Sequence, residues 1–134
     1  MKGYLIQEKQ IIRGEECFIE SRSPENAYGV IFQDDGDTAY FYAVQSEAGT
    51  DQLVILDALH IYQVDDQPAG PSQLGILWSM DWLACALILN GTCHALFDFE
   101  TRGGYNINAF PPPNQIWTQG ERALDNDLIR SRFG

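Results

Sequence analysis

The chain has 134 residues, of which 45% are hydrophobic and 12% aromatic, so it predicts one globular domain over residues 1–134 and excludes a disordered chain. Eight basic residues against nineteen acidic ones give a net charge of −11 and a pI near 4.3. This balance excludes the basic surface that nucleic acids and anionic membranes require, so neither is expected as a partner.

Strand-like segments fill the N-terminal third of the chain. Leu5–Ile12 and Cys17–Arg22 predict two short strands, and Pro24 ends the second. Gly29–Gln33 and Thr38–Gln45 are rich in β-branched and aromatic residues, which favours two further strands.

The acidic segment Asp34–Asp37 joins these last two strands. Its Asp-Gly step supplies the positive φ that a tight hairpin turn requires. The positions of its glycine and carboxylates do not match a calcium-binding loop, so a solvated turn is expected. In the strand that follows, Tyr40 and Tyr42 share one face, and Phe41 takes the other.

The middle of the chain has a less regular pattern. The apolar residues of Leu53–Val64 fit neither the helix period nor the strand period. We predict a strand over Leu53–Leu56, and the remainder stays open. Asp65–Ser72 contains two prolines and a glycine and predicts a loop, and Leu74–Ser79 predicts the next strand.

The strongest local signal is a hairpin formed by Leu83–Leu89 and Thr92–Phe99. Asn90-Gly91 between two apolar runs is typical of a type I′ turn. Both faces of the hairpin are apolar, which predicts a place in the middle of a sheet with packing on each side. A two-residue turn would pair Leu89 with Thr92, Ile88 with Cys93, Leu87 with His94, and Cys85 with Leu96.

The C-terminal region changes character. Phe110–Asn114 is proline-rich and predicts a loop. From Gln115 to Phe133 the apolar spacing suits an amphipathic helix, with acidic residues near its start and Arg130 and Arg132 near its end. The sequence therefore predicts an α+β domain: a mostly antiparallel, curved β-sheet built as a meander of hairpins, with a C-terminal α-helix packed on it.

The three cysteines, Cys17, Cys85 and Cys93, are an odd number and indicate no disulfide framework. The first residues turn polar too soon for a signal peptide, and the longest apolar run is too short to cross a bilayer. We therefore expect a cytoplasmic protein with reduced thiols.

No catalytic motif is present, so we predict no catalytic residue, no metal ligand and no cofactor. Two histidines are weighed as alternatives. His60 follows Asp57 at a spacing of three, and His94 adjoins Cys93, but neither pattern completes a zinc or nucleophile site. Asp98 and Glu100, at a spacing of two on one strand, fit an exposed edge better than a glycosidase pair.

Acidic residues occur in small groups along the chain and are its most usable feature. Such groups steer encounter with a basic protein, and nearby aromatic residues supply interface anchors. The residues predicted to bind a partner are Asp34, Asp35, Asp37, Asp65, Asp66, Tyr62 and Trp82.

Six segments together resemble one bacterial family, the domain-of-unknown-function family 2251, over roughly residues 28 to 130. They are Val30–Ala43, Ile55–Tyr62, Ile76–Ser79, Leu87–Gly91, His94–Phe99 and Phe110–Pro113. The resemblance implies no established activity and no catalytic residues. In size and acidity the family is similar to the small immunity proteins that neutralise bacterial toxins, which is a likeness of class.

Three hypotheses follow for the function. The first is a non-enzymatic acidic module that binds a basic protein, with an immunity protein as its specific form. The second is a small-molecule-binding protein or small enzyme that uses a sheet pocket near His60 and His94. The third is a structural homodimer that pairs through a strand edge or the apolar face around Trp78 and Trp82.

Overall fold

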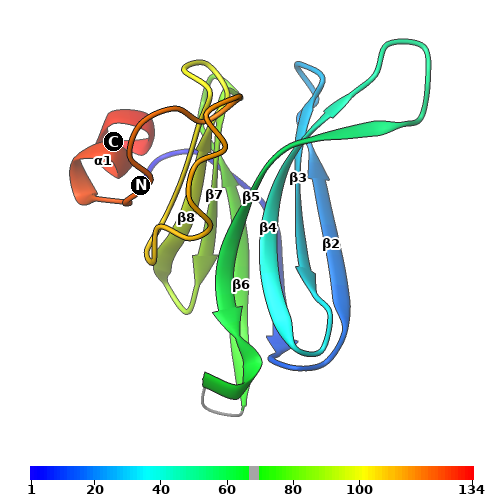
Figure 1. The fold of residues 1–134 in the computed structure, drawn as a ribbon, viewed down its shortest axis with the longest axis vertical. Helices are drawn as coiled ribbons and strands as arrows, with labels where there is room; N and C mark the ends of the chain where they lie inside the picture. The colour runs from blue at the N-terminus through cyan, green and yellow to red at the C-terminus, as the bar shows by residue number, and fades with distance from the viewer. Residues whose placement is uncertain (67–69) are drawn as a thin grey trace.

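The computed structural model describes residues 1–66 and 70–134, which form two stacked antiparallel β-sheets and one helix (Figure 1). Sheet A has the strand order β1-β6-β7-β8-β9, and sheet B has the order β2-β3-β4-β5. The strands of sheet A are β1 (Tyr4–Ile12), β6 (Pro71–Trp78), β7 (Ala84–Leu89), β8 (Thr92–Asp98) and β9 (Gly103–Asn106). The strands of sheet B are β2 (Cys17–Arg22), β3 (Tyr28–Asp34), β4 (Thr38–Ser46) and β5 (Leu53–Gln63).

The main core lies between the two sheets. Alternate residues of each strand point inward, and Phe32 and Phe41 of sheet B meet Trp78 and Phe97 of sheet A. The rings of Phe41 and Phe97 stack with centroids 5.2 Å apart. The indole N–H of Trp78 donates to the Ser21 hydroxyl at 2.9 Å, so its one polar atom is satisfied across the sandwich.

A second apolar cluster covers the outer face of sheet A. Helix α1 (Asn126–Phe133) places Phe133 against Ala84, Ala86 and Leu96 of β7 and β8. The side chain of Asp125 caps the helix by accepting from the Leu128 amide at 2.8 Å. The hairpin β7–β8 thus has packing on both faces, as its two apolar faces predicted.

The register of this hairpin differs from the simple prediction by one bulge. Leu89 pairs with Thr92 and Ile88 with Cys93, as expected. His94 is then the extra residue of a β-bulge, so Leu87 lies opposite Ala95 instead. The prediction assumed a regular ladder from the turn onward, and the sequence pattern gives no sign of the extra residue.

The ambiguous segment Leu53–Val64 is almost entirely the strand β5. The register of β5 against β4 shifts twice, with the extra residues Leu56 and Ile61 on β5. Each bulge reverses which residues face the core, so no single period fits the segment. A short 3-10 helix, η1 (Val64–Asp66), follows.

The predicted α+β class is confirmed, with two adjustments. The strands divide into two stacked sheets, which the term curved sheet did not specify. The helix begins at Asn126 instead of Gln115, because residues 115–124 follow irregular backbone, including a bridge of Ala123 to Asn106. The predicted loop at Asp65–Ser72 partly lies at residues 67–69, outside the described residues.

Candidate functional site

Charge is divided very unevenly between the two sheets. Residues 14–66, which form sheet B and its turns, contain twelve acidic residues and one basic residue, Arg22. That segment alone accounts for the net charge of −11. The rest of the chain holds seven acidic and seven basic residues, so sheet A and the helix are neutral together. A count by segment would have found this division in the sequence.

Three acidic turns meet at one end of the sandwich. Exposed carboxylates project from the β1–β2 turn, the β3–β4 turn and η1. The Val64 amide donates to the Asp37 carbonyl at 2.8 Å and joins η1 to the β3–β4 turn. The acidic turns comprise Glu15, Glu16, Asp35, Asp37, Asp65 and Asp66. The structure therefore brings together four of the predicted partner residues: Asp35, Asp37, Asp65 and Asp66.

Asp34 and Tyr62 hold these turns together from inside. The Asp34 carboxylate accepts from the Tyr62 hydroxyl at 2.6 Å and from the amides of Gly14 and Gly36 at 2.9 Å each. Burial, together with the hydrogen bond to Asp34, raises the pKa of Tyr62 well above its usual range. Asp34 is 1% exposed and Tyr62 is 3% exposed, so their predicted place on a partner surface is corrected to a structural one.

Trp82 lies at the opposite end of the sandwich from the acidic turns. Strand β1 runs from Tyr4, opposite Trp78, to Ile12, opposite Pro71. Trp82 stacks on Tyr4 with ring centroids 4.7 Å apart and packs against Trp78. The prediction that placed Trp82 in one surface with the acidic groups is therefore not supported by its position.

The outer face of sheet B carries a row of aromatic side chains that the sequence analysis did not select. Phe18, Gln33, Tyr40 and His60 lie opposite one another across the four strands. The rings of Tyr40 and Tyr42 are 6.0 Å apart, and Tyr40 meets His60 edge to face at 5.5 Å. Among the described residues no helix covers this face, whereas α1 lies on the far side of sheet A (Figure 1).

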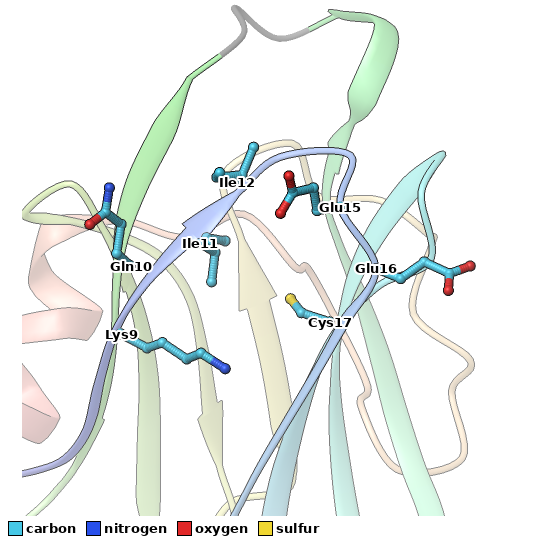
Figure 2. A pocket seen from close by; sticks show the side chains of 7 residues that line it. All are labelled: Lys9, Gln10, Ile11, Ile12, Glu15, Glu16 and Cys17. Atoms are coloured by element: carbon cyan, nitrogen blue, oxygen red, sulfur yellow. The ribbon is translucent and has the colours of Figure 1, made fainter.

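A groove separates the edge strands β1 and β2, as Figure 2 shows. Its volume is about 330 Å³, and it is lined by Lys9–Ile12 on β1 and by Glu15–Cys17 at the start of β2. A second hollow of about 360 Å³ over β2 and β3 shares Glu16 and Cys17 with it. Burial raises the pKa of the Cys17 thiol, so this cysteine is not an activated nucleophile.

The two histidines of the chain line one small hollow of about 190 Å³ together with Asn108. The buried amide of Asn106 donates to Asn108 Oδ1 at 2.9 Å, and Asn108 Nδ2 lies 2.7 Å from His60 Nδ1. Burial lowers the pKa of His94, which keeps its ring neutral near pH 7.

The carboxylates considered for catalysis are engaged in ion pairs. Asp57 Oδ2 accepts from Arg122 Nη2 at 2.6 Å and from the Thr118 hydroxyl at 2.5 Å. A Cβ on Gly104 would lie 2.7 Å from the same oxygen, so only glycine fits there. Asp98 lies 3.6 Å from Nε of Arg132 on the helix. These contacts link the C-terminal segment to the sheets.

The described residues contain no group of three or more His, Cys, Asp or Glu side chains that could hold a metal ion. No helix in residues 1–66 or 70–134 is long and apolar enough to cross a membrane.

Comparison with known proteins identifies the family. Residues 11–133 match the model of the family described as uncharacterized protein conserved in bacteria (DUF2251). The chain belongs to this family. The DUF2251 match begins at Ile11 and so includes sheet B, the acidic turns, the two-histidine hollow and the helix, and it leaves most of β1 outside.

A relative in Haemophilus influenzae, described as an uncharacterized protein, is 38% identical over 98 residues. The match covers 70% of this chain and 60% of that relative, so the chain spans about three fifths of the relative's length. No solved structure matches. Because DUF2251 and this relative are both described as uncharacterized, the function has to be argued from the site.

Proposed function

We propose that the protein is a non-enzymatic, acidic protein-binding module whose partner is a basic protein. The single observation that carries the proposal is the uneven charge: the net charge of −11 lies on residues 14–66, and the outer face of sheet B in that segment has no covering helix among the described residues. An uncovered sheet with acidic turns, beside a neutral, helix-covered one, suits a partner of opposite charge.

The chemistry of the face fits this role. Charge concentrated on one side attracts a basic partner from a distance and raises its association rate. Tyrosine and phenylalanine side chains are enriched at the centres of protein interfaces, where they supply contact area at low entropic cost. Phe18, Tyr40 and Tyr42 provide such anchors, and Phe18 is 61% exposed. The acidic turns form the rim at one end of the face. They comprise Glu15, Glu16, Asp35, Asp37, Asp65 and Asp66.

The specific form that we propose is an immunity protein that neutralises a bacterial toxin. Toxins that cleave nucleic acids carry basic active-site clefts, because they must bind phosphates. An acidic surface with aromatic anchors complements such a cleft and blocks it without any chemistry of its own. This form predicts a tight, equimolar complex.

The test uses the purified protein as bait in a lysate of the source organism at low and high salt. We expect one basic protein to be retained in near-equal amount, with an association rate that falls as salt rises. The pair of substitutions Asp35→Asn and Asp37→Asn should slow association with that protein several-fold at low salt. Retention of no basic protein at either salt concentration contradicts the proposal.

The matched control carries the same change of charge on the neutral half of the chain. Glu121→Gln with Asp127→Asn removes two exposed carboxylates near helix α1, far in the sequence from sheet B. We expect this control to associate at the rate of the unchanged protein. An equal slowing in both variants would show that total charge matters and that sheet B is not the binding face.

A second candidate function is small-molecule binding in the hollow between His60 and His94. The observation that favours it is that both histidines line this one hollow with Asn108, whose Nδ2 lies 2.7 Å from His60 Nδ1. A screen by protein-observed NMR tests it. Ligands that shift the His60 and His94 signals, and that lose binding in His60→Phe, support this function, and a screen without such ligands contradicts it.

A further inference from the structure

The outer edge of strand β2 has unpaired backbone groups. Strand β2 pairs with β3 alone among the described residues. The Ser23 amide donates to the Tyr28 carbonyl at 2.9 Å, one step beyond the last pair of the β2–β3 register. Hydrogen-bonded pairs alternate in an antiparallel ladder, so the odd-numbered residues of β2 bond to β3. The amides and carbonyls of Phe18, Glu20 and Arg22 therefore point away from the sheet.

The groove of Figure 2 lies where the side chains of an added strand would go. A strand paired to the free edge of β2 would send alternate side chains inward, between the two sheets. There the groove offers Ile11 and Cys17, and Figure 2 shows the Cys17 sulfur turned toward the gap. Its volume of about 330 Å³ accommodates apolar side chains of moderate size. The inward positions of the added strand should therefore be apolar.

The charges around the groove specify the outward positions. Glu15 and Glu16 line the groove, and Asp35 lines the adjoining hollow. Glu20 lies on the outer face of β2 itself. Lys9 is the one basic side chain that lines either hollow in the described residues. Three exposed carboxylates against one ammonium around the two hollows favour basic side chains on the outward positions, whereas Glu20 is already paired with Arg22 at 3.3 Å.

The other strand that borders the groove, β1, is protected against the same kind of pairing. Strand β1 carries the adjacent charges Glu8 and Lys9 and is interrupted by a bulge at Ile6. Charged residues and bulges are the devices by which sheet edges avoid pairing. A second copy of the chain is also disfavoured at β2, because it would bring another net charge of −11 to the same edge.

We propose that the free edge of β2 binds an extended segment of the partner protein, in which apolar and basic residues alternate, as a fifth strand of sheet B. Addition of a strand to an open edge is a common mode of peptide recognition, with main-chain hydrogen bonds for affinity and alternate side chains for specificity. The inference rests on the proposed function, and it names the mode of binding and the partner segment's chemistry.

The first experiment uses a short capped peptide of alternating valine and lysine as the probe. We expect it to bind the full chain, to shift the NMR signals of Phe18, Glu20 and Arg22, and to slow exchange of their amide protons. A matched peptide of alternating proline and lysine carries the same charge but cannot form the ladder. It should bind at least about tenfold more weakly, since hydrogen bonds are lost. Equal binding of both peptides overturns the inference.

The second experiment changes the backbone of β2 itself. Glu20→Pro removes an amide that faces solvent, which an edge strand tolerates, and Glu20→Ala removes the same side chain but keeps the amide. Both lose the Glu20–Arg22 ion pair, so they differ only at the backbone. We expect the proline variant to bind the valine–lysine peptide at least about tenfold more weakly than the alanine variant. Equal affinities overturn the inference, provided both variants melt cooperatively.

The two proposals fail in different ways. Suppose that a basic protein binds and that Asp35→Asn with Asp37→Asn slows its association. If Glu20→Pro and Glu20→Ala then bind this protein equally well, the proposed function stands and the edge is not used. If both peptides leave the β2 signals unchanged, the strand inference is likewise overturned. If the valine–lysine peptide binds at β2 while no basic protein is captured, the edge inference holds and the proposed function fails.

Discussion

The outer faces of the two sheets differ in their composition and in whether a helix covers them. Sheet A has apolar residues on both faces, and helix α1 covers the outer one with Phe133. Sheet B has an outer face of tyrosine, phenylalanine and polar side chains, and no helix of the described residues covers it. Residues 14–66, which form sheet B and its turns, carry the whole net charge of −11. The remaining residues, which include sheet A and the helix, are neutral together.

This difference distinguishes a face that is buried for stability from a face that is left bare for binding. An apolar face must be buried, because exposed apolar area costs free energy in water. A face of tyrosine and polar side chains remains soluble when bare, so its composition needs another explanation, and binding supplies one. Substitutions in both sheets test this contrast, and those at buried contacts should have the greatest effect on stability.

The largest effect is expected where the two halves are joined. Arg122 is 2% exposed, and its Nη2 pairs with Asp57 of sheet B, while its carbonyl accepts from Asn106 of sheet A. Arg122→Met leaves the Asp57 carboxylate buried without its cation, which should lower the free energy of unfolding by about 4 kcal/mol. Urea denaturation measures this. The double variant Asp57→Leu, Arg122→Met should recover much of the loss, and a double variant no better than the single one would contradict the explanation.

Removal of the helix anchor should uncover sheet A. Phe133→Ala empties the space against Ala84 and Leu96 and should cost about 3 kcal/mol of unfolding free energy. It should also increase binding of an apolar dye, because the outer face of sheet A becomes accessible. Arg130→Ala, on the exposed side of the same helix, is the control and should change stability by less than about 1 kcal/mol. Unchanged dye binding in Phe133→Ala would show that the helix is not the cover.

The hydroxyl of Tyr62 should stabilise the end of sheet B at which the acidic turns lie. Tyr62→Phe removes the hydrogen bond to the Asp34 carboxylate and should cost about 2 kcal/mol. The pKa of Tyr62 is raised in the folded state, so its contribution is complete below the ordinary tyrosine pKa of about 10 and is lost as pH rises above it. Stability of the unchanged protein should therefore fall faster than that of Tyr62→Phe above this pH, and parallel curves would refute the linkage.

The smallest effect on stability is expected at the exposed carboxylates of the acidic turns. Asp37→Asn and Asp66→Asn replace charge without changing shape, and each should alter the unfolding free energy by less than about 0.5 kcal/mol. Their effect should appear instead in the rate of association with a basic protein. A large loss of stability would mean that these carboxylates are structural, as Asp34 is.

Local patterns in the sequence predicted most of the strands and the β7–β8 hairpin, but not the pairing of strands distant in sequence, such as β1 with β6. Asn90-Gly91 located the β7–β8 hairpin, and its two apolar faces correctly indicated a central position. The bulge at His94 shifted the pairing, because an extra residue leaves no mark in the hydrophobic pattern. Of the predicted partner residues, Asp35, Asp37, Asp65 and Asp66 lie together at one end, whereas Asp34 and Tyr62 are buried and hydrogen-bonded to each other.

The strand content, the family and the division of charge along the chain can be read from the sequence, since these depend on composition and local order. The folded structure is needed to show that Glu15, Asp35 and Asp65 meet at one end, that the edge of β2 is open, and that Trp82 lies at the opposite end. These relations depend on how strands far apart in sequence stack and pair. That choice is set by burial of the shared core, which no local pattern records.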